Sequence, residues 1–209
     1  MRNLLITILS CTFYLAPAQN FSVSAFKNNV FYIGVDNPLS ILVENYPSGQ
    51  VVVKTTKGEV HGQGPIHIYR GVEPGYTSII LYKKDELTEI GRNNFRVKYI
   101  PDPIAKVGPS AGGKIKKVVL QNQQFIRADL ENFDFDVRFG VDSFTFNIIR
   151  TDTCFFRELF NVSSTFSKDL AEALNMIKTN DMVIFKNIYA KGPDGRTLLL
   201  NPVVFSITD

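Results

Sequence analysis

Residues 132–149, NFDFDVRFGVDSFTFNII, alternate apolar and polar side chains over most of their length. Successive side chains of a β-strand point to opposite faces of a sheet, so this alternation is typical of a half-buried strand. The apolar members are expected to face a core: Phe133, Phe135, Val137 and Phe139. The charged members are expected on the opposite, solvated face, as a candidate docking surface: Asp134, Asp136 and Arg138.

Strand character extends along most of the chain. The 209 residues include 17 Phe and 8 Tyr, and short apolar runs alternate with turn residues. Many short strands separated by turns are typical of a sandwich or barrel. One helix is expected near 168–179, with Ser167 as its N-cap and Leu170, Leu174 and Ile177 along one face. The sequence therefore predicts an all-β protein, a sandwich or barrel with one short α-helix.

A proline- and glycine-rich stretch divides the chain. Pro101, Asp102 and Pro103 open it, and proline holds the backbone extended without donating to a sheet ladder. We expect a first β-sandwich over 19–100, a linker over 101–113 and a second β-sandwich over 114–209 that contains the helix. The expected structural turns are an early turn at Gly34, Asp36, Asn37 and Pro38 and a late hairpin at Gly192, Pro193, Asp194 and Gly195.

The first residues resemble an export signal. Arg2 precedes an apolar run, and Ala16-Pro17-Ala18 is a cleavage-site pattern, which predicts a signal peptide over 1–18. The alternative is a lipoprotein signal in which Cys11 becomes the lipidated N-terminus. Both interpretations predict export to the periplasm or beyond, and no other transmembrane candidate is present in the sequence.

Two patterns suggest sites but lack the context that those sites need. GPSAGGK at 108–114 has P-loop spacing, but Ile115 replaces the required Ser or Thr and the following residues resemble a strand. We therefore expect a glycine-rich joint and no nucleotide. Cys154 lies beside two phenylalanines, which favours a buried, unreactive thiol.

Catalytic and metal-binding patterns are also weak. His61 and His67 have only Glu59 as a nearby third ligand, so ordinary surface histidines are expected. Asp134 and Asp136 could form a carboxylate pair, but Arg138 on the same face favours a charge-balanced surface. A net charge of +3, evenly spread, gives no indication of nucleic-acid binding. We therefore expect no catalytic, cofactor-binding or metal-binding residues. A protein without such sites works by binding.

Four segments in order resemble one family. They are FYIGVDNPLSI (31–41), FRVKYIPDPIAKVG (95–108), ADLENFDFDVRF (128–139) and NIYAKGPDGRTLLLNPVVFSI (187–207). Together they are similar to the C-terminal periplasmic half of GldM, called PorM in non-gliding relatives, of the gliding-motility and type IX secretion machinery. The resemblance implies two immunoglobulin-like domains without a catalytic site, held in a periplasmic dimer. It also implies a path toward the ring formed by GldK and GldN at the outer membrane.

The sequence departs from that family in one respect. It has no counterpart of the family's membrane anchor or earlier periplasmic domains, which predicts a free periplasmic relative of the GldM tip. We expect a non-catalytic protein-binding module whose partners are envelope proteins such as GldK- or GldN-like ring components. A homodimer and a monomer both remain open. The alternative is an adhesin or glycan-binding module that uses exposed tyrosines as platforms: Tyr46, Tyr69, Tyr76 or Tyr99.

Overall fold

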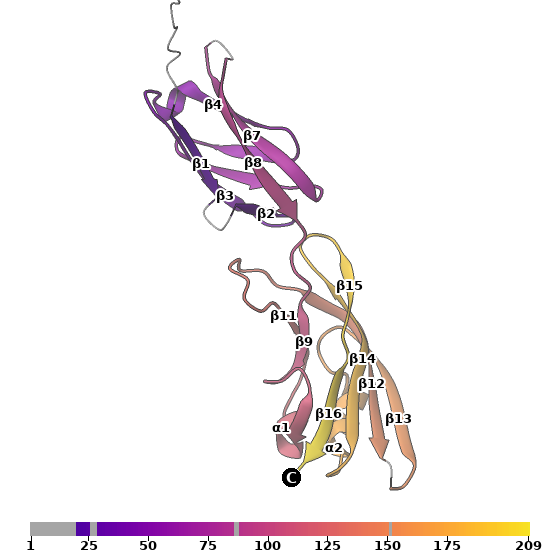
Figure 1. Ribbon diagram of the computed structural model, residues 1–209. Helices are drawn as coiled ribbons and strands as arrows, with labels where there is room; N and C mark the ends of the chain where they lie inside the picture. Colours follow the sequence, from indigo (N-terminus) through magenta and orange to yellow (C-terminus); the bar gives the residue numbers. More distant parts are fainter. Residues whose placement is uncertain (1–19, 26–28, 86–87, 151) are drawn as a thin grey trace, which may run out of the picture.

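The computed structural model describes residues 20–25, 29–85, 88–150 and 152–209. The predicted signal peptide and Cys11 lie outside these residues. Two β domains follow one another along an elongated molecule (Figure 1). The all-β sandwich prediction is confirmed.

The first domain is a sandwich of two four-stranded sheets. One sheet has the order β1-β3-β6-β5 and the other β2-β8-β7-β4. The strands are β1 (Phe21–Ala25), β2 (Val30–Tyr32), β3 (Asn37–Val43), β4 (Val51–Thr55), β5 (Glu59–Gln63), β6 (Ile66–Arg70), β7 (Gly75–Lys83) and β8 (Glu89–Lys98), with a short 3-10 helix at Ser48–Gln50. The ring of Phe31 stacks between Tyr69 and Phe95, with centroid distances of 4.3 and 4.5 Å. This aromatic stack fills the core between the two sheets.

The second domain is built on one large sheet. Its main path is β10-β16-β14-β12-β13, with β15 paired to β14. The strands are β10 (Gly113–Lys116), β12 (Gly140–Arg150), β13 (Phe155–Val162), β14 (Met182–Lys191), β15 (Thr197–Leu200) and β16 (Val203–Thr208). The second layer consists of the paired strands β9 (Ile104–Val107) and β11 (Ile126–Asp129) and the helices α1 (Lys117–Gln121) and α2 (Lys168–Asn175). The core lies between these layers around Phe144, Phe146 and Phe185.

The predicted helix begins where the sequence indicates. The Ser167 hydroxyl accepts a hydrogen bond of 3.3 Å from the Leu170 N–H, and α2 buries Leu170 and Leu174. The helix ends at Asn175, earlier than the expected residue 179.

Three expectations about this domain are wrong. Residues 117–121 form α1 and not a strand, so the described part of the chain has two α-helices where one was expected. Strand β10 pairs in parallel with β16 only as far as Lys116 and Thr208, and beyond that α1 can still bury Leu120. The predicted linker contains β9, which buries Ala105 and Val107 and pairs with β11, so most of 101–113 belongs to the second domain.

The third error concerns residues 133–138, which lie outside any strand. Strand β11 ends at Asp129 and the β12 ladder begins only at Gly140, so no neighbouring strand is paired with this segment. The alternating exposure is nevertheless present: Phe133, Phe135 and Val137 are half-buried, and the charged residues between them are exposed.

A buried ion pair joins β12 to the segment after α2. Arg150 donates to both carboxylate oxygens of Asp181 at 2.8 and 2.7 Å, and the Lys178 N–H donates to the same carboxylate at 2.8 Å. The Asp181 side chain is 1% exposed. Burial favours the protonated carboxyl, but the hydrogen bonds from Arg150 and Lys178 outweigh it and hold the pKa of Asp181 below its usual value.

We expect Asp181→Ala to lower the free energy of unfolding by about 3–5 kcal/mol, because it leaves Arg150 partly buried without its anion. Urea denaturation at pH 7 measures this loss. Since the folded pKa is depressed, the contribution of Asp181 is present above about pH 4 and is lost as the pH falls through the lowered pKa. The difference between wild type and variant should therefore shrink toward pH 2. The matched control is Glu172→Ala, which breaks an exposed pair with Lys168 and should cost under about 0.5 kcal/mol. Equal losses for both variants would contradict the assignment.

Candidate functional site

The joint between the domains is an aromatic contact. The Tyr32 ring, at the end of β2, meets Phe133 edge-on at 4.8 Å and Phe135 at 5.6 Å between centroids. Phe133 and Phe135 lie 5.3 Å apart. The alternating segment thus contacts the first domain through Phe133 and Phe135, while Val137 packs against the second-domain core. These two phenylalanines were expected in a core; both are half-buried at the joint, and Phe133 also packs against the second-domain core.

The two turns predicted from the sequence meet at this joint. Gly34 follows β2 with φ +83°, and a Cβ on Gly34 would lie 2.5 Å from the backbone nitrogen of Asp194. Only glycine combines this left-handed conformation with so close a backbone approach. Asn37 holds the same turn: its side-chain carbonyl accepts from the Tyr32 N–H at 2.8 Å, and its amide donates to the Tyr32 carbonyl at 2.9 Å. The early turn and the late hairpin are therefore opposing surfaces of one contact.

Arg196 links the hairpin to the chain that connects the domains. Its guanidinium donates to the carbonyl of Ile100 at 2.6 Å and to the fully buried Asp194 carboxylate at 2.7 Å. It also lies 4.4 Å from the Tyr99 ring centroid and 3.5 Å from an Asp102 oxygen. A planar guanidinium can serve all these partners at once, which lysine cannot. Sequence reasoning missed Arg196; its position one residue after the GPDG turn was the available signal.

The candidate docking surface predicted from the sequence lies beside the joint. Asp134, Asp136 and Arg138 are exposed, on the loop before β12. Asp136 and Arg138 line a hollow of about 420 Å³ together with Gly34, Asp36 and Pro193. Asp36 is engaged by Arg70 at 2.6 Å, and this hydrogen bond lowers the pKa of Asp36. The structure thus brings Asp136 and Arg138 to a hollow that both domains line.

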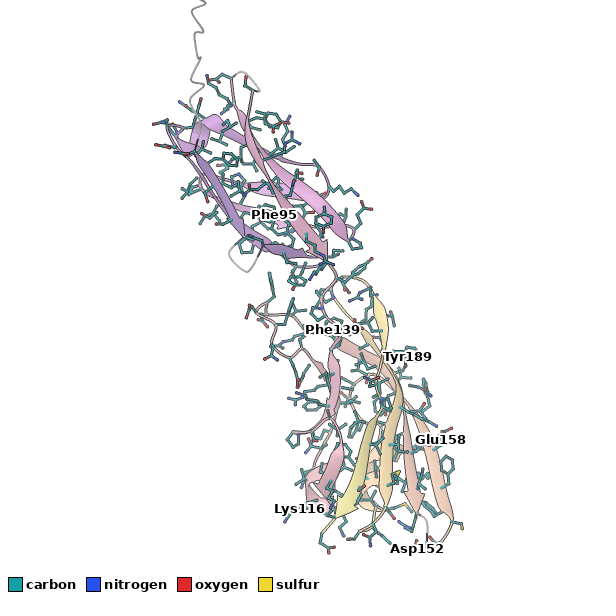
Figure 2. All side chains as sticks on the ribbon, viewed as in Figure 1. Phe95, Lys116, Phe139, Asp152, Glu158 and Tyr189 are labelled. Carbon is teal, nitrogen blue, oxygen red and sulfur yellow. The ribbon has the colours of Figure 1, made fainter. Side chains whose placement is uncertain are left out.

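A second surface was not predicted. Phe156, Phe160 and Val162 on β13 are 60%, 67% and 71% exposed and share the outer face of the large sheet. The β-ladder places Ile149 and Met182 in the row of Phe156, and Ile184 and Val204 in the next row. We call these residues the outer apolar face. Glu158 lies on β13 within this face (Figure 2). It pairs with Lys186 at 2.9 Å.

The apolar character of this face is unusual, because only the opposite side of the large sheet packs against the core. Strands of such a sheet ordinarily present polar residues to water. Within the described residues, β13 pairs with β12 on one side and with no strand on the other. The polar–apolar alternation that could have indicated the face is absent, because FFRELFNV is apolar at both kinds of position.

Other expected residues are placed as follows. Lys114 is exposed within β10, so it lies in a strand and not in a phosphate loop. His61 is exposed and pairs with Glu59 at 3.1 Å, as expected of a surface histidine. His67 was expected at the surface, but it points into the first domain and is 8% exposed. Cys154 was expected to be buried, but it is exposed in the turn before β13.

Among the described residues, no cluster of three or more His, Cys, Asp or Glu side chains could hold a metal ion. No helix in the same part of the chain is long and apolar enough to cross a bilayer. The tyrosines of the glycan-binding alternative are scattered. Tyr69 is buried in the first core and Tyr99 lies under Arg196, whereas Tyr76 is exposed.

Two protein-family models match the chain, one for each of its two domains. Residues 20–98 match the family model of the GldM third domain, and residues 101–208 match that of the GldM C-terminal domain. The chain belongs to the GldM family. The boundary between the two matches falls at Tyr99 and Ile100, where Arg196 binds the connecting chain. GldM domains associate the protein with the gliding and type IX secretion machinery of the cell envelope, and they are not known to be catalytic.

Two solved structures matched by the chain have TM-scores below 0.5. The adhesin InvE of Yersinia pseudotuberculosis is 13% identical with a TM-score of 0.31, over 90% of this chain and 58% of that one. Domains 4 and 5 of the S-layer protein SbsC are 10% identical with a TM-score of 0.36, over 93% of this chain and all of theirs. The chain thus spans little more than half of the adhesin structure. No curated protein sequence matches the chain.

The contact at Gly34 is testable with a matched pair of glycines. Gly34 and Gly195 have φ of +83° and +81°, but a Cβ at Gly195 meets nothing within 4 Å. Ala at either position carries the strain of the left-handed backbone. Only Gly34→Ala also collides with Asp194, so we expect it to displace the two domains relative to each other. Small-angle X-ray scattering, or spin-label distances between β5 and β13, should change for Gly34→Ala and not for Gly195→Ala. Identical distances in both variants would contradict the contact.

Proposed function

We propose that this GldM-family chain is a non-catalytic periplasmic protein that works by binding an outer-membrane ring component similar to GldK or GldN. The observation that carries the proposal is the outer apolar face around Phe156, Phe160 and Val162. Contiguous exposed apolar surface on a folded domain marks a site of protein interaction. The family supplies the setting, because GldM-family domains operate among envelope proteins.

The geometry of β13 favours a protein over a small ligand. The strand offers a row of backbone groups at the edge of the sheet and, beside it, projecting aromatic side chains. An extended segment of a partner can add to such an edge, with the aromatic side chains supplying contact area. Phenylalanine gains from this burial about 25 cal/mol for each Å² of apolar surface removed from water.

The loop with Asp134, Asp136 and Arg138 is the second candidate docking surface. Its charges would direct orientation and the rate of encounter more than affinity. This loop and the outer apolar face both belong to the second domain, so one partner could engage both surfaces, or either alone. Separate variants distinguish the two surfaces.

We expect the double variant Phe156→Lys, Phe160→Lys to lose capture of the ring components. The measurement is pull-down of tagged protein from envelope extract of its native host, quantified by mass spectrometry, with at least a tenfold loss of GldK- and GldN-like proteins. Both side chains are mostly exposed, so each change should alter the free energy of unfolding by only about 0.5 kcal/mol. Thermal denaturation checks that the variant is folded.

The matched control is Leu42→Lys, which places the same charge on an exposed apolar position of β3 in the first domain. It should leave capture unchanged. The variant Asp134→Lys, Asp136→Lys tests the loop, and a loss there alone would move the binding surface to the joint. Full capture by the Phe156, Phe160 variant would overturn the assignment of the outer apolar face. Absence of both ring components in the wild-type pull-down would overturn the proposed function.

A further inference from the structure

A cavity of about 280 Å³ opens between the two sheets of the first domain. It lies at the end of β3 that is remote from the joint, because β3 begins beside the Gly34 turn and reaches the cavity at Ile41 and Val43. Its remaining lining comes mainly from β4 and the β5–β6 hairpin: Leu42, Tyr46, Val51, Val53, Gly64, Pro65 and His67. Val43, Val51 and Val53 are only partly buried, so the aromatic core stops short of this end.

Two titratable side chains line this cavity, His67 and Tyr46. His67 pairs with Leu39 in the β3–β6 ladder and faces inward like Tyr69, two residues further on. The side chain is 8% exposed, and its Nδ1 is buried with no hydrogen-bond partner. A buried polar atom without a partner is rare in a folded protein and requires an explanation. Here the atom belongs to a residue that lines a cavity.

The cavity has an approach from solvent. A second hollow of about 540 Å³ shares Val51, Gly64 and His67 with the first, so the imidazole borders both. Gly62 pairs with His67 across the hairpin, and a Cβ there would lie 2.7 Å from the His67 Cα. The stretch HGQGPIH thus keeps bulk away from the imidazole, which a strand of ordinary residues would cover.

The chemistry of the wall selects the ligand. Burial lowers the pKa of His67, and Lys84 is the only charged residue lining either hollow. A neutral imidazole has one ring nitrogen that donates and one that accepts. It therefore suits an uncharged hydroxyl, which can do both, better than an anion. The valine and isoleucine walls suit an apolar ring or short chain, and the volume is at the small end for ligand pockets.

We propose that this cavity is a binding site for a small uncharged amphiphile: an apolar ring or short chain with one hydroxyl, which hydrogen-bonds to the imidazole of His67. The site lies in the first domain, apart from both candidate docking surfaces, and does not depend on the proposed function.

The chain offers a clean experiment because it has only two histidines. Long-range ¹H–¹⁵N NMR spectra of labelled protein report both imidazoles, and His61 is an internal control because it is exposed and paired with Glu59. The probe is p-cresol, and toluene is its counterpart without the hydroxyl. We expect p-cresol to shift the ring nitrogens of His67 and not those of His61, with at least tenfold higher affinity than toluene.

Two variants complete the test. His67→Phe should reduce the preference for p-cresol over toluene to less than twofold; backbone amide shifts of Val51 and Val53 report binding in this variant. Val51→Phe should fill the cavity and abolish binding of both probes while His67 remains. No shift of His67 with p-cresol, equal shifts of both histidines, or equal affinity for the two probes would each overturn the proposal. A cavity that holds only ordered water would give the first of these results.

Discussion

The arrangement of the two domains depends on the contacts that the guanidinium of Arg196 makes. It binds the Ile100 carbonyl at the boundary between the domains, the buried Asp194 carboxylate of the hairpin and the face of the Tyr99 ring. Two prolines with one residue between them cannot be held by sheet hydrogen bonds alone, because neither has an N–H. The Arg196 side chain supplies hydrogen bonds in place of the missing sheet hydrogen bonds, and it holds the hairpin against the chain that connects the domains. With the hairpin fixed, Gly34 can meet Asp194, and Tyr32 can meet Phe133 and Phe135.

Local patterns predicted the elements whose causes are local. Ser167 begins α2 because its hydroxyl accepts from the backbone three residues later, and the late hairpin turns with a local hydrogen bond of 3.1 Å from the Gly195 N–H to the Gly192 carbonyl. The alternation at 133–139 was a different matter. A period of two reports that neighbouring side chains have two environments. Here the apolar side packs at the joint and against the second-domain core, and the charged side is in water. The pattern cannot report whether another strand is present to pair with, which is what makes an extended segment a strand.

The same limit explains the sites that the sequence did not predict. Arg196, His67 and the outer apolar face owe their character to residues far away in the chain. Arg196 meets Ile100, 96 residues earlier. His67 is buried because it shares the inward face of β6 with Tyr69, which packs against Phe31 of the other sheet. Phe156 and Phe160 were indistinguishable from core residues in FFRELFNV; they are in water because they lie on the side of β13 opposite to Phe155 and Leu159, which pack against the core. The residue type at each of these positions is plain from the sequence, but its surroundings depend on distant residues and could not be predicted.

The exposed aromatic side chains of β13 favour association with other chains, whereas the charged pair among them opposes it. An exposed edge with aromatic side chains invites association with any extended chain, and folded proteins ordinarily blunt such edges with charge. Here the charge is placed inside the face: Glu158 lies between Phe156 and Phe160 and pairs with Lys186 on the outer surface of β14. A partner that covers the face must accommodate this ion pair as well as the two rings, whereas a uniformly apolar strand would leave the pair desolvated without compensation. The arrangement therefore admits specific binding while it opposes the indiscriminate association that two exposed phenylalanines alone would favour.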